Sequence, residues 1–234
     1  MGEIDFSRFE AVTFDCFGTL IDWEQGILNA LQPVLAPQGI DAGEDELLER
    51  YARHEAALEA GGYLPYRDVL AGSLRALCAE LDVSASDDDA HVFAQAIAHW
   101  PAFPDTAPAL RRLHERFRLG VITNCDRDLF ALSHRRLGVT FDWVVTAEDA
   151  QAYKPSHIPF ELAFATIEVP RDRILHAAQS LFHDHVPAKE LGLTTVLVDR
   201  RHGRPGSGAT PEASATPDLA VTDMRALADL AVCH

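Results

Sequence analysis

Short apolar runs that alternate with helical patterns limit the folds open to this chain more than any other feature. The first run, AVTFDCF, occupies residues 11–17, and the later runs are RLGVITN, WVVTAED, ILHAAQS and TTVLVDR. Strands that alternate with helices along a chain indicate parallel strands joined by crossover helices. The sequence therefore predicts an α/β protein built on a parallel sheet.

The segment from Trp23 to about Trp100 departs from this alternation. Four of its stretches have helical patterns and are separated by Gly, Pro and acidic N-cap signals: GILNALQPVLAPQG, EDELLERYARHEAALEAGG, YRDVLAGSLRALCAELDV and DDAHVFAQAIAHW. We therefore expect a helical domain at residues 23–99, inserted into an α/β domain of residues 1–22 and 100–234. Near the C-terminus, RRHGRPGSGATPEASATP predicts a mobile loop before a last strand and helix.

Composition and charge limit the partners and the compartment. A net charge of −16 disfavours nucleic acid, and an anionic small substrate would need local Lys or Arg side chains. No apolar stretch approaches the roughly 18 residues of a membrane span, and the first residues lack signal-peptide features, so we expect a cytoplasmic protein without a membrane partner. The scattered Cys16, Cys78, Cys125 and Cys233 predict reduced thiols and no structural zinc.

Polar side chains follow the predicted strands. They are Asp15 after the first, Thr123 and Asn124 after the second, Lys154 beyond the third, and Gln179 to Asp184 after the fourth. Taken singly, each has an ordinary explanation as a turn former, a helix cap or a solvated side chain. Ligands of open parallel sheets bind beyond the carboxyl ends of the strands. The repeated placement at successive strand ends therefore favours one shared site.

Four motifs carry a family resemblance. FDCFGTLID, VITNCD, YKP and QSLFHDHVPAKELG resemble the sequence motifs of the haloacid dehalogenase-like hydrolase superfamily, and the likeness spans nearly the whole chain. The helical insertion after the first motif resembles the cap of the type II 2-haloacid dehalogenases and of their phosphatase relatives. This resemblance implies a Rossmann-like parallel sheet with helices on both faces and an inserted α-helical cap domain. Because relatives are often dimers, it also allows a homodimer.

Phe17 separates two branches of that superfamily. Its phosphatases generally carry a second Asp two residues after the nucleophile, which protonates the departing alkoxide. Phe17 cannot supply a proton, whereas a halide ion can leave without one. The pattern resembles the dehalogenase branch, which implies metal-independent hydrolysis of a small anionic substrate, a short 2-haloalkanoic acid such as an L-2-haloacid or haloacetate. No cofactor is expected.

The resemblance implies three catalytic residues. Asp15 would attack the substrate Cα, displace the halide and form an ester. Water would then attack the carbonyl carbon of that ester, placed or activated by Asp184. Lys154 would hold Asp15 ionised and oriented without a metal.

It also implies substrate contacts. Thr123 and Asn124 would donate hydrogen bonds to the substrate carboxylate or to Asp15. Phe17, with Trp23, is expected to line an apolar wall. Gln179 stands where the dehalogenases typically place a small polar residue, and it is a further candidate contact.

A cap arginine contributes to halide binding in the dehalogenases. Arg50, in LLERYARHEA, is the candidate in this chain, and Arg53 and Arg67 are further candidates. A charged helical face also explains these arginines without any role in the chemistry.

Two other functions stay open. A Mg²⁺-dependent phosphatase of the same fold could act on a small phosphomonoester with Asp15 and Asp184, but Gln179 replaces the first acidic residue of the GDSLxxD pattern and weakens that site. A catalytically idle binding protein is the second alternative, against which the retention of Asp15, Lys154 and Asp184 argues. His183 and His185 lie two residues apart, a poor spacing for one helical face, so we expect no histidine metal site.

Overall fold

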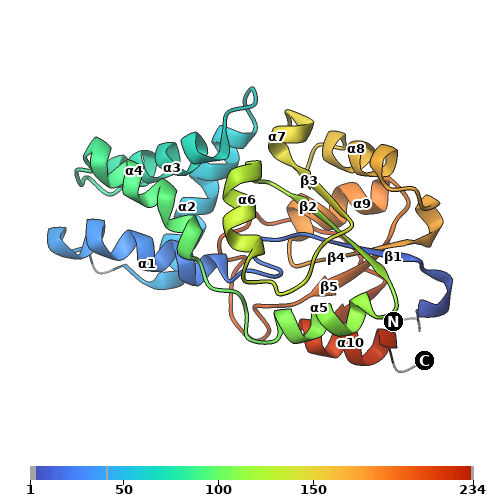
Figure 1. Ribbon diagram of the computed structural model, residues 1–234. Helices are drawn as coiled ribbons and strands as arrows, with labels where there is room; N and C mark the ends of the chain where they lie inside the picture. Colours follow the sequence, from blue (N-terminus) through green and yellow to red (C-terminus); the bar gives the residue numbers. More distant parts are fainter. Residues whose placement is uncertain (1–3, 41, 233–234) are drawn as a thin grey trace.

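The computed structural model, which describes residues 4–40 and 42–232, has a six-stranded parallel sheet at its centre (Figure 1). The strand order is β3-β2-β1-β4-β5-β6. The strands are β1 (Ala11–Phe14), β2 (Arg118–Thr123), β3 (Trp143–Thr146), β4 (Ile174–Ala178), β5 (Thr194–Val198) and β6 (Leu219–Val221). The expected parallel α/β sheet is confirmed. Its order reverses between β1 and β4, and crevices outside the strand ends form at such a point.

Helices cover both faces of the sheet, which explains why the inner strands are apolar on both sides. One face packs against α5 (Thr106–His114) and α10 (Met224–Val232), which also contact each other. The other face packs against α8 (Ile158–Thr166) and α9 (Val186–Glu190). The remaining helices beside the sheet are α6 (Arg127–His134) and the short α7 (Ala147–Ala150).

The inserted segment forms four α-helices, as expected, and these lie to one side of the sheet (Figure 1). They are α1 (Trp23–Leu35), α2 (Glu44–Glu59), α3 (Tyr66–Glu80) and α4 (Asp87–Gln95), followed by the 3-10 helix η3 (Ala96–His99). Gly26 lets α1 approach the end of this segment closely, since an added Cβ would lie 2.3 Å from the Trp100 ring. We propose that residues 23–99 form a cap domain and that residues 1–22 and 100–234 form the core domain.

The segment between β5 and β6 has no helix or strand, but it is tied to the cap. The Arg201 guanidinium is buried and lies 2.6 Å from Glu24 of α1 and 2.8 Å from Asp45 of α2. Arg204 pairs with the same two carboxylates. These ion pairs contradict the expectation of a mobile loop over the whole segment, because its first part is held against two helices.

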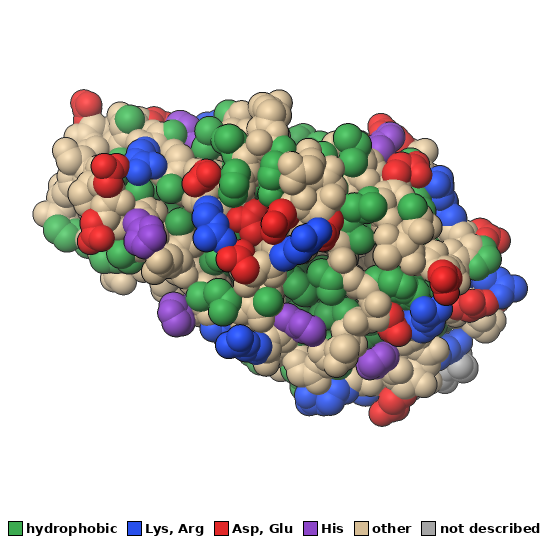
Figure 2. Space-filling view, turned by 45° about the horizontal axis from the view of Figure 1, so that its top comes forward, with side chains coloured by type: hydrophobic (Ala, Val, Ile, Leu, Met, Phe, Trp, Pro, Cys, Tyr) green, Lys and Arg blue, Asp and Glu red, His purple; other side chains and the backbone are tan. Residues whose placement is uncertain are grey.

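Charged side chains of both signs lie next to each other on the surface. Figure 2 shows one face, on which acidic side chains gather close to Lys and Arg side chains while hydrophobic ones are scattered. Arg67 and Asp128 form one exposed ion pair, with 2.6 Å between their closest atoms. Exposed pairs of this kind contribute little to stability, about 0–1 kcal/mol each.

Three of the cysteines, Cys16, Cys78 and Cys125, are buried free thiols, and Cys233 lies outside the described residues. None of the helices in the part of the chain that the structure describes is long and apolar enough to cross a membrane.

Candidate active site

Asp15 follows the last residue of β1 and is buried at the carboxyl end of the sheet. Its backbone N–H donates to the Ala177 carbonyl of β4, and its Oδ2 accepts a 2.7 Å hydrogen bond from Thr19 Oγ1. The chain turns back between these two residues through Gly18, whose φ of +95° favours glycine. The FGT sequence thus returns a hydroxyl donor to the carboxylate that precedes it.

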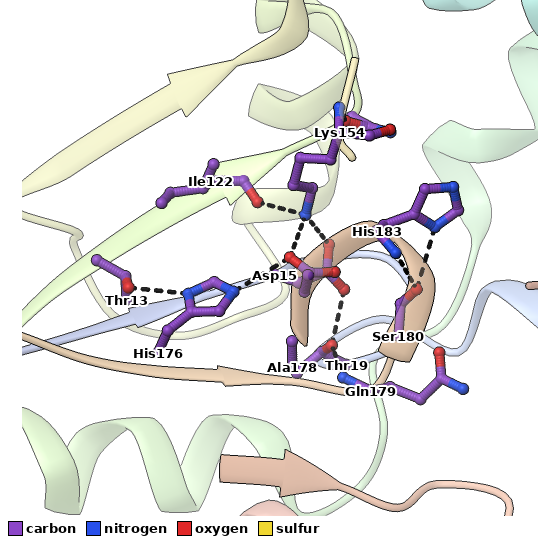
Figure 3. Close-up of polar contacts among 12 residues, drawn as sticks. Thr13, Asp15, Thr19, Ile122, Lys154, His176, Ala178, Gln179, Ser180 and His183 are labelled. Atoms are coloured by element: carbon purple, nitrogen blue, oxygen red, sulfur yellow. Dashed lines mark hydrogen bonds and ion pairs between the residues drawn. The ribbon is translucent and has the colours of Figure 1, made fainter. Parts of the chain in front are cut away.

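Lys154 joins Asp15 to Asp184, and Figure 3 shows Lys154 beside Asp15 and Ile122. Its Nζ lies 2.9 Å from Asp15 Oδ1, 2.7 Å from Asp184 Oδ1 and 2.9 Å from the Ile122 carbonyl oxygen. The side chain of Asn124 holds the backbone of this lysine from both sides, because its Nδ2 donates to the Lys154 carbonyl and its Oδ1 accepts from the Lys154 N–H. All three charged side chains are buried.

Burial and mutual attraction compete in setting the charges of this group. Burial alone would lower the pKa of Lys154, but Asp15 and Asp184 outweigh it and raise that pKa above its ordinary value. For Asp184, burial is likewise outweighed, by Lys154 and His176, and the pKa falls below its ordinary value. Burial raises the pKa of Asp15 in spite of the opposing charge of Lys154. The arrangement is an ammonium between two carboxylates, with Asp15 the less stabilised of the two.

Asp184 has one engaged and one unengaged oxygen. Besides Lys154, its Oδ1 lies 3.1 Å from His176 Nε2, and the other ring nitrogen of His176 lies 2.9 Å from Thr13 Oγ1 (Figure 3). Its Oδ2 is buried and has no hydrogen-bond partner within the described residues. That oxygen is therefore free to accept a hydrogen bond from a small molecule such as water. Sequence reasoning missed His176, whose signal is a polar residue inside the apolar strand ILHAA.

An inner cavity of about 20 Å³, space for about one water molecule, lies against Asp15. Phe17 and Trp23 line its apolar part, as expected. Thr123 lines it too, and the Thr123 hydroxyl has no partner among the residues described. A larger cavity of about 380 Å³ lies next to it, and Glu59 and Lys154 line both.

Two glutamates of α2, Glu55 and Glu59, line the inner cavity. Sequence reasoning missed both as site residues. Tyr51 and Tyr66 each donate a 3.0 Å hydrogen bond to Glu55 Oε1. Asn124 Nδ2 donates to Glu59 Oε2 at 3.3 Å. Burial raises the pKa of Glu55 to about 7, and burial together with the charge of Glu55 raises the pKa of Glu59 well above its ordinary value. We call Glu55 and Glu59 the carboxyl pair.

The candidate arginines form ion pairs away from the inner cavity, so the expected contact of Arg50 with the substrate has no support in this geometry. The Arg50 guanidinium pairs with Glu46 and Glu80, and Arg53 also pairs with Glu80. Arg67 pairs with Asp128. None of the three arginines is among the residues that line the inner cavity in the described chain. The physical reason is the rotation of α2, which directs positions 50 and 53 toward α3.

Gln179 supports the site from outside the inner cavity. Its backbone N–H donates to Thr19 Oγ1 at 2.9 Å, and its side-chain oxygen accepts from Thr210. It therefore acts on Asp15 only through Thr19, and it is not among the described residues that line the cavity.

The two histidines of the fourth motif point to different partners. His183 lines the inner cavity, while His185 Nε2 lies 2.9 Å from the Ala178 carbonyl oxygen. Burial lowers the pKa of each to about 4, so both are neutral at pH 7. A group of three or more His, Cys, Asp or Glu side chains placed to hold a metal is not found within residues 4–40 and 42–232.

Comparison with known proteins adds family evidence to this geometry. The haloacid dehalogenase-like hydrolase family matches residues 9–177. The chain is 27% identical over 202 residues to (S)-2-haloacid dehalogenase H-109 of Pseudomonas putida. The aligned residues cover 82% of this chain and 86% of that protein. It is 25% identical over 199 residues to haloacetate dehalogenase H-2 of Moraxella sp. (strain B), with 82% and 87% covered.

A solved structure has the same fold. It is the L-2-haloacid dehalogenase from Xanthobacter autotrophicus with chloropropionic acid covalently bound, and it superposes with a TM-score of 0.79. The sequences are 19% identical, and the match covers 95% of this chain and 98% of that one. This likeness shows that the two chains share a fold.

Proposed function

The chain belongs to the haloacid dehalogenase-like hydrolase family, and from this premise we propose that it hydrolyses the carbon–halogen bond of short 2-haloalkanoic acids without a metal. One observation carries the proposal: the Lys154 ammonium lies within hydrogen-bond distance of both Asp15 and Asp184. A lysine so placed can hold a carboxylate nucleophile ionised and oriented. The names of the relatives, which include (S)-2-haloacid and haloacetate dehalogenases, support the same substrate class.

In the first step, Asp15 attacks the Cα that carries the halogen. A carboxylate oxygen lone pair forms the new C–O bond, and the electrons of the C–X bond leave with the halide. Thr19 and Lys154 each donate to one of the two carboxylate oxygens, which limits rotation of the nucleophile. Phe17, beside the nucleophile, has no proton to give, and none is needed for a halide.

In the second step, water attacks the carbonyl carbon of the ester on Asp15. Asp184 Oδ2, which is unengaged among the described side chains, accepts one proton of that water. The tetrahedral intermediate then expels the alkoxide, which takes this proton and leaves as the 2-hydroxy acid. Asp15 loses the remaining proton to solvent, so each cycle releases one halide ion and one proton.

The substrate carboxylate needs donors on the sheet side. Thr123 Oγ1 is buried at the cavity without a partner in the described chain, so it can donate there. Asn124 already uses its side chain for Lys154 and Glu59, which assigns it to positioning rather than to substrate contact. Phe17 and Trp23 would contact the carbon chain of the substrate.

The phosphatase alternative receives less support. A magnesium ion would need acidic ligands beside Asp15 and Asp184, but Gln179 stands in the first acidic position and binds Thr210. An alkoxide leaving group would also need a proton donor at position 17, where Phe17 stands. These residues fit a phosphoryl-transfer site poorly.

The test is a screen for halide release with EDTA present. The substrates are both enantiomers of 2-chloropropionate together with chloroacetate and fluoroacetate. We expect release of halide and formation of the 2-hydroxy acid in equal amounts. Turnover of an aryl phosphate that requires Mg²⁺, together with no halide release from any haloacid, would contradict the proposal.

A further inference from the structure

We infer that Glu59 of α2 donates a hydrogen bond from a protonated carboxyl group to the leaving halogen, the role for which the sequence suggested an arginine. This role rests on the proposed function, since the halogen leaves only if Asp15 attacks the carbon that carries it. It adds a catalytic residue on the cap side of the site, and it makes Glu55 a positioning residue.

The direction of displacement places the halogen near α2. In a displacement at carbon, the leaving atom departs on the side opposite the attacking oxygen. Asp15 stands at the end of β1, and the residues that line the inner cavity from the cap include Glu55 and Glu59. Glu59 is also within reach of the core, because Asn124 donates to it. The departing halogen therefore moves toward the carboxyl pair.

The balance of charge in the cavity requires a neutral carboxyl at Glu59. The inner cavity is lined by four carboxyl groups, and Lys154 is its one Lys or Arg within the described residues. Lys154 is already shared between Asp15 and Asp184. An ionised Glu59 would repel a halide that gathers negative charge in this poorly solvated space. A protonated carboxyl would instead stabilise that charge by donating to it.

The surroundings of Glu59 favour the protonated form. The groups that face it are Glu55 on its own helix and Lys154, Asn124 and His183 from the core. Burial raises the pKa of Glu59 first, the charge of Glu55 adds to the rise, and Lys154 opposes it. His183 is neutral at pH 7, since its pKa is about 4. The phenols of Tyr66 and Tyr153 also stay neutral, because burial raises the pKa of each.

The proton of Glu59 has no acceptor in the described structure. Its hydrogen bonds there are with Asn124 Nδ2, which is itself the donor. The nearest side-chain nitrogen that could accept is His183 Nε2, 3.6 Å away, and this buried atom has no hydrogen-bond partner among the described residues. The carboxyl group of Glu59 and the Nε2 atom of His183 thus lie close to each other at the cavity without forming a hydrogen bond. A halogen that enters the cavity can therefore accept a hydrogen bond from the protonated carboxyl group of Glu59.

The hydrogen bond adds no proton transfer to the reaction. The C–X electrons leave with the halide, the Glu59 proton stays on its carboxyl oxygen, and the halide then departs to solvent. Because Glu59 also lines the larger cavity, the halide can leave past it. Glu55 accepts hydrogen bonds from Tyr51 and Tyr66. These bonds hold α2 in the position in which Glu59 can contact the halogen.

The test compares leaving groups in Glu59→Leu, Glu59→Gln and the wild type. Hydrogen-bond acceptance falls from fluoride to iodide, so we expect Glu59→Leu to slow kcat for fluoroacetate and chloroacetate at least about ten-fold more than for iodoacetate. Glu59→Gln keeps an N–H donor of similar size, and it should retain the leaving-group order of the wild type. Glu44→Gln, an exposed change on the same helix, is the matched control and should change nothing.

A pH profile gives a second readout that does not depend on the folding of the leucine variant. Wild-type kcat should fall as rising pH removes the Glu59 proton, and Glu59→Gln should lose this alkaline decline. Equal slowing of all haloacetates, or an alkaline decline that persists in Glu59→Gln, would overturn the role of Glu59 alone. A wild type that releases no halide would instead overturn the proposed function and this role with it.

Discussion

Asp15 has a donor on each of its carboxylate oxygens, and the two donors differ in kind. Thr19 donates a neutral hydrogen bond, whereas Lys154 donates a charged one. Burial disfavours the ionised form of Asp15, so the charge of Lys154 opposes that cost. A carboxylate that water solvates poorly, yet that is paired with an ammonium, is well suited to attack carbon.

The first prediction concerns Asp15→Asn. The amide is a poor nucleophile of the same shape, so halide release should fall by about a thousand-fold or more. In the wild type, multiple turnovers in ¹⁸O-labelled water should place label in the Asp15 side chain, detected by mass spectrometry of the peptide. Wild-type enzyme that turns over many times with an unlabelled peptide would contradict the ester intermediate. The variant's far-ultraviolet circular dichroism should match that of the wild type.

The second prediction concerns Lys154→Met, which removes a buried ammonium and leaves Asp15 and Asp184 unpaired. We expect a loss of about 3–5 kcal/mol in the free energy of unfolding near neutral pH. The loss should shrink at lower pH, where protonation of the unpaired carboxylates removes their repulsion. Urea unfolding at about pH 8 and pH 5 measures this.

Lys189→Met is the matched control for that lysine. Its pair with Asp218 is partly exposed, so its removal should cost no more than about 1 kcal/mol. Equal losses for the two lysines would show that the bridge between Asp15 and Asp184 contributes little to stability.

At the scale of single elements, α2 shows what sequence can and cannot predict. Its periodicity predicted a helix, and the helix is present. The buried face of that helix includes Leu48, Tyr51, Ala52 and Glu55, at the i, i+3, i+4 and i+7 spacing. Arg50 lies off this face. The resemblance to the dehalogenases directed attention to the arginine, whereas the apolar spacing along the helix indicates that Glu55 faces inward.

Strands were predicted well because the inner strands β1 and β4 are buried along their whole length and read as apolar runs. The first run was assigned to residues 11–17, but β1 ends at Phe14, since the following residues turn to bring Thr19 to Asp15. The placement of Asp15, Lys154 and Asp184 at the ends of successive predicted strands already favoured one shared site. The pairing of Arg201 with Glu24 and Asp45 could not be predicted, because no local pattern links segments so far apart.

The third prediction concerns the packing of α2 on α3 through Glu55. Burial raises the pKa of Glu55 from 4.5 to about 7, so the folded protein holds this proton more tightly than the unfolded chain does. Its contribution to stability is full below about pH 4.5 and is lost as pH rises through about 7, a decline of about 3 kcal/mol. Glu55→Gln should remove this decline.

Urea unfolding of the wild type and of Glu55→Gln across that pH range measures the difference, with Glu44→Gln as the exposed control. Parallel stability curves for the wild type and Glu55→Gln would show that Glu55 ionises in the folded protein as readily as in the unfolded chain.

At the scale of the whole molecule, one ion-pair cluster joins the two proposed domains. Arg201 follows β5 of the core, and its partners Glu24 and Asp45 belong to α1 and α2. The backbone N–H of Ala209 also donates to Glu24. The segment thus fixes how the cap helices rest on the core, although it contains no residue that lines the inner cavity in the described structure.

The fourth prediction is that Arg201→Met loosens this contact. Two carboxylates lose a buried partner, so unfolding should become easier by about 3 kcal/mol. Residues 202–217 should also become sensitive to proteinase K, which limited proteolysis and mass spectrometry would locate. Arg225→Met, which removes an exposed pair with Asp223, is the control and should leave both measurements unchanged. If Arg201→Met resists protease as well as the wild type does, the ion pairs of Arg201 do not hold this segment in place.

The inner cavity of about 20 Å³ also has a kinetic consequence. A haloacid is several times larger than one water molecule, so we expect the helices that line this cavity to swing away before it reaches Asp15, and the product to leave by the same movement. Solvent friction opposes such a swing but hardly affects bond making within a closed pocket. Turnover that slows with added viscogen would mark this movement, rather than the chemistry, as the rate-limiting step.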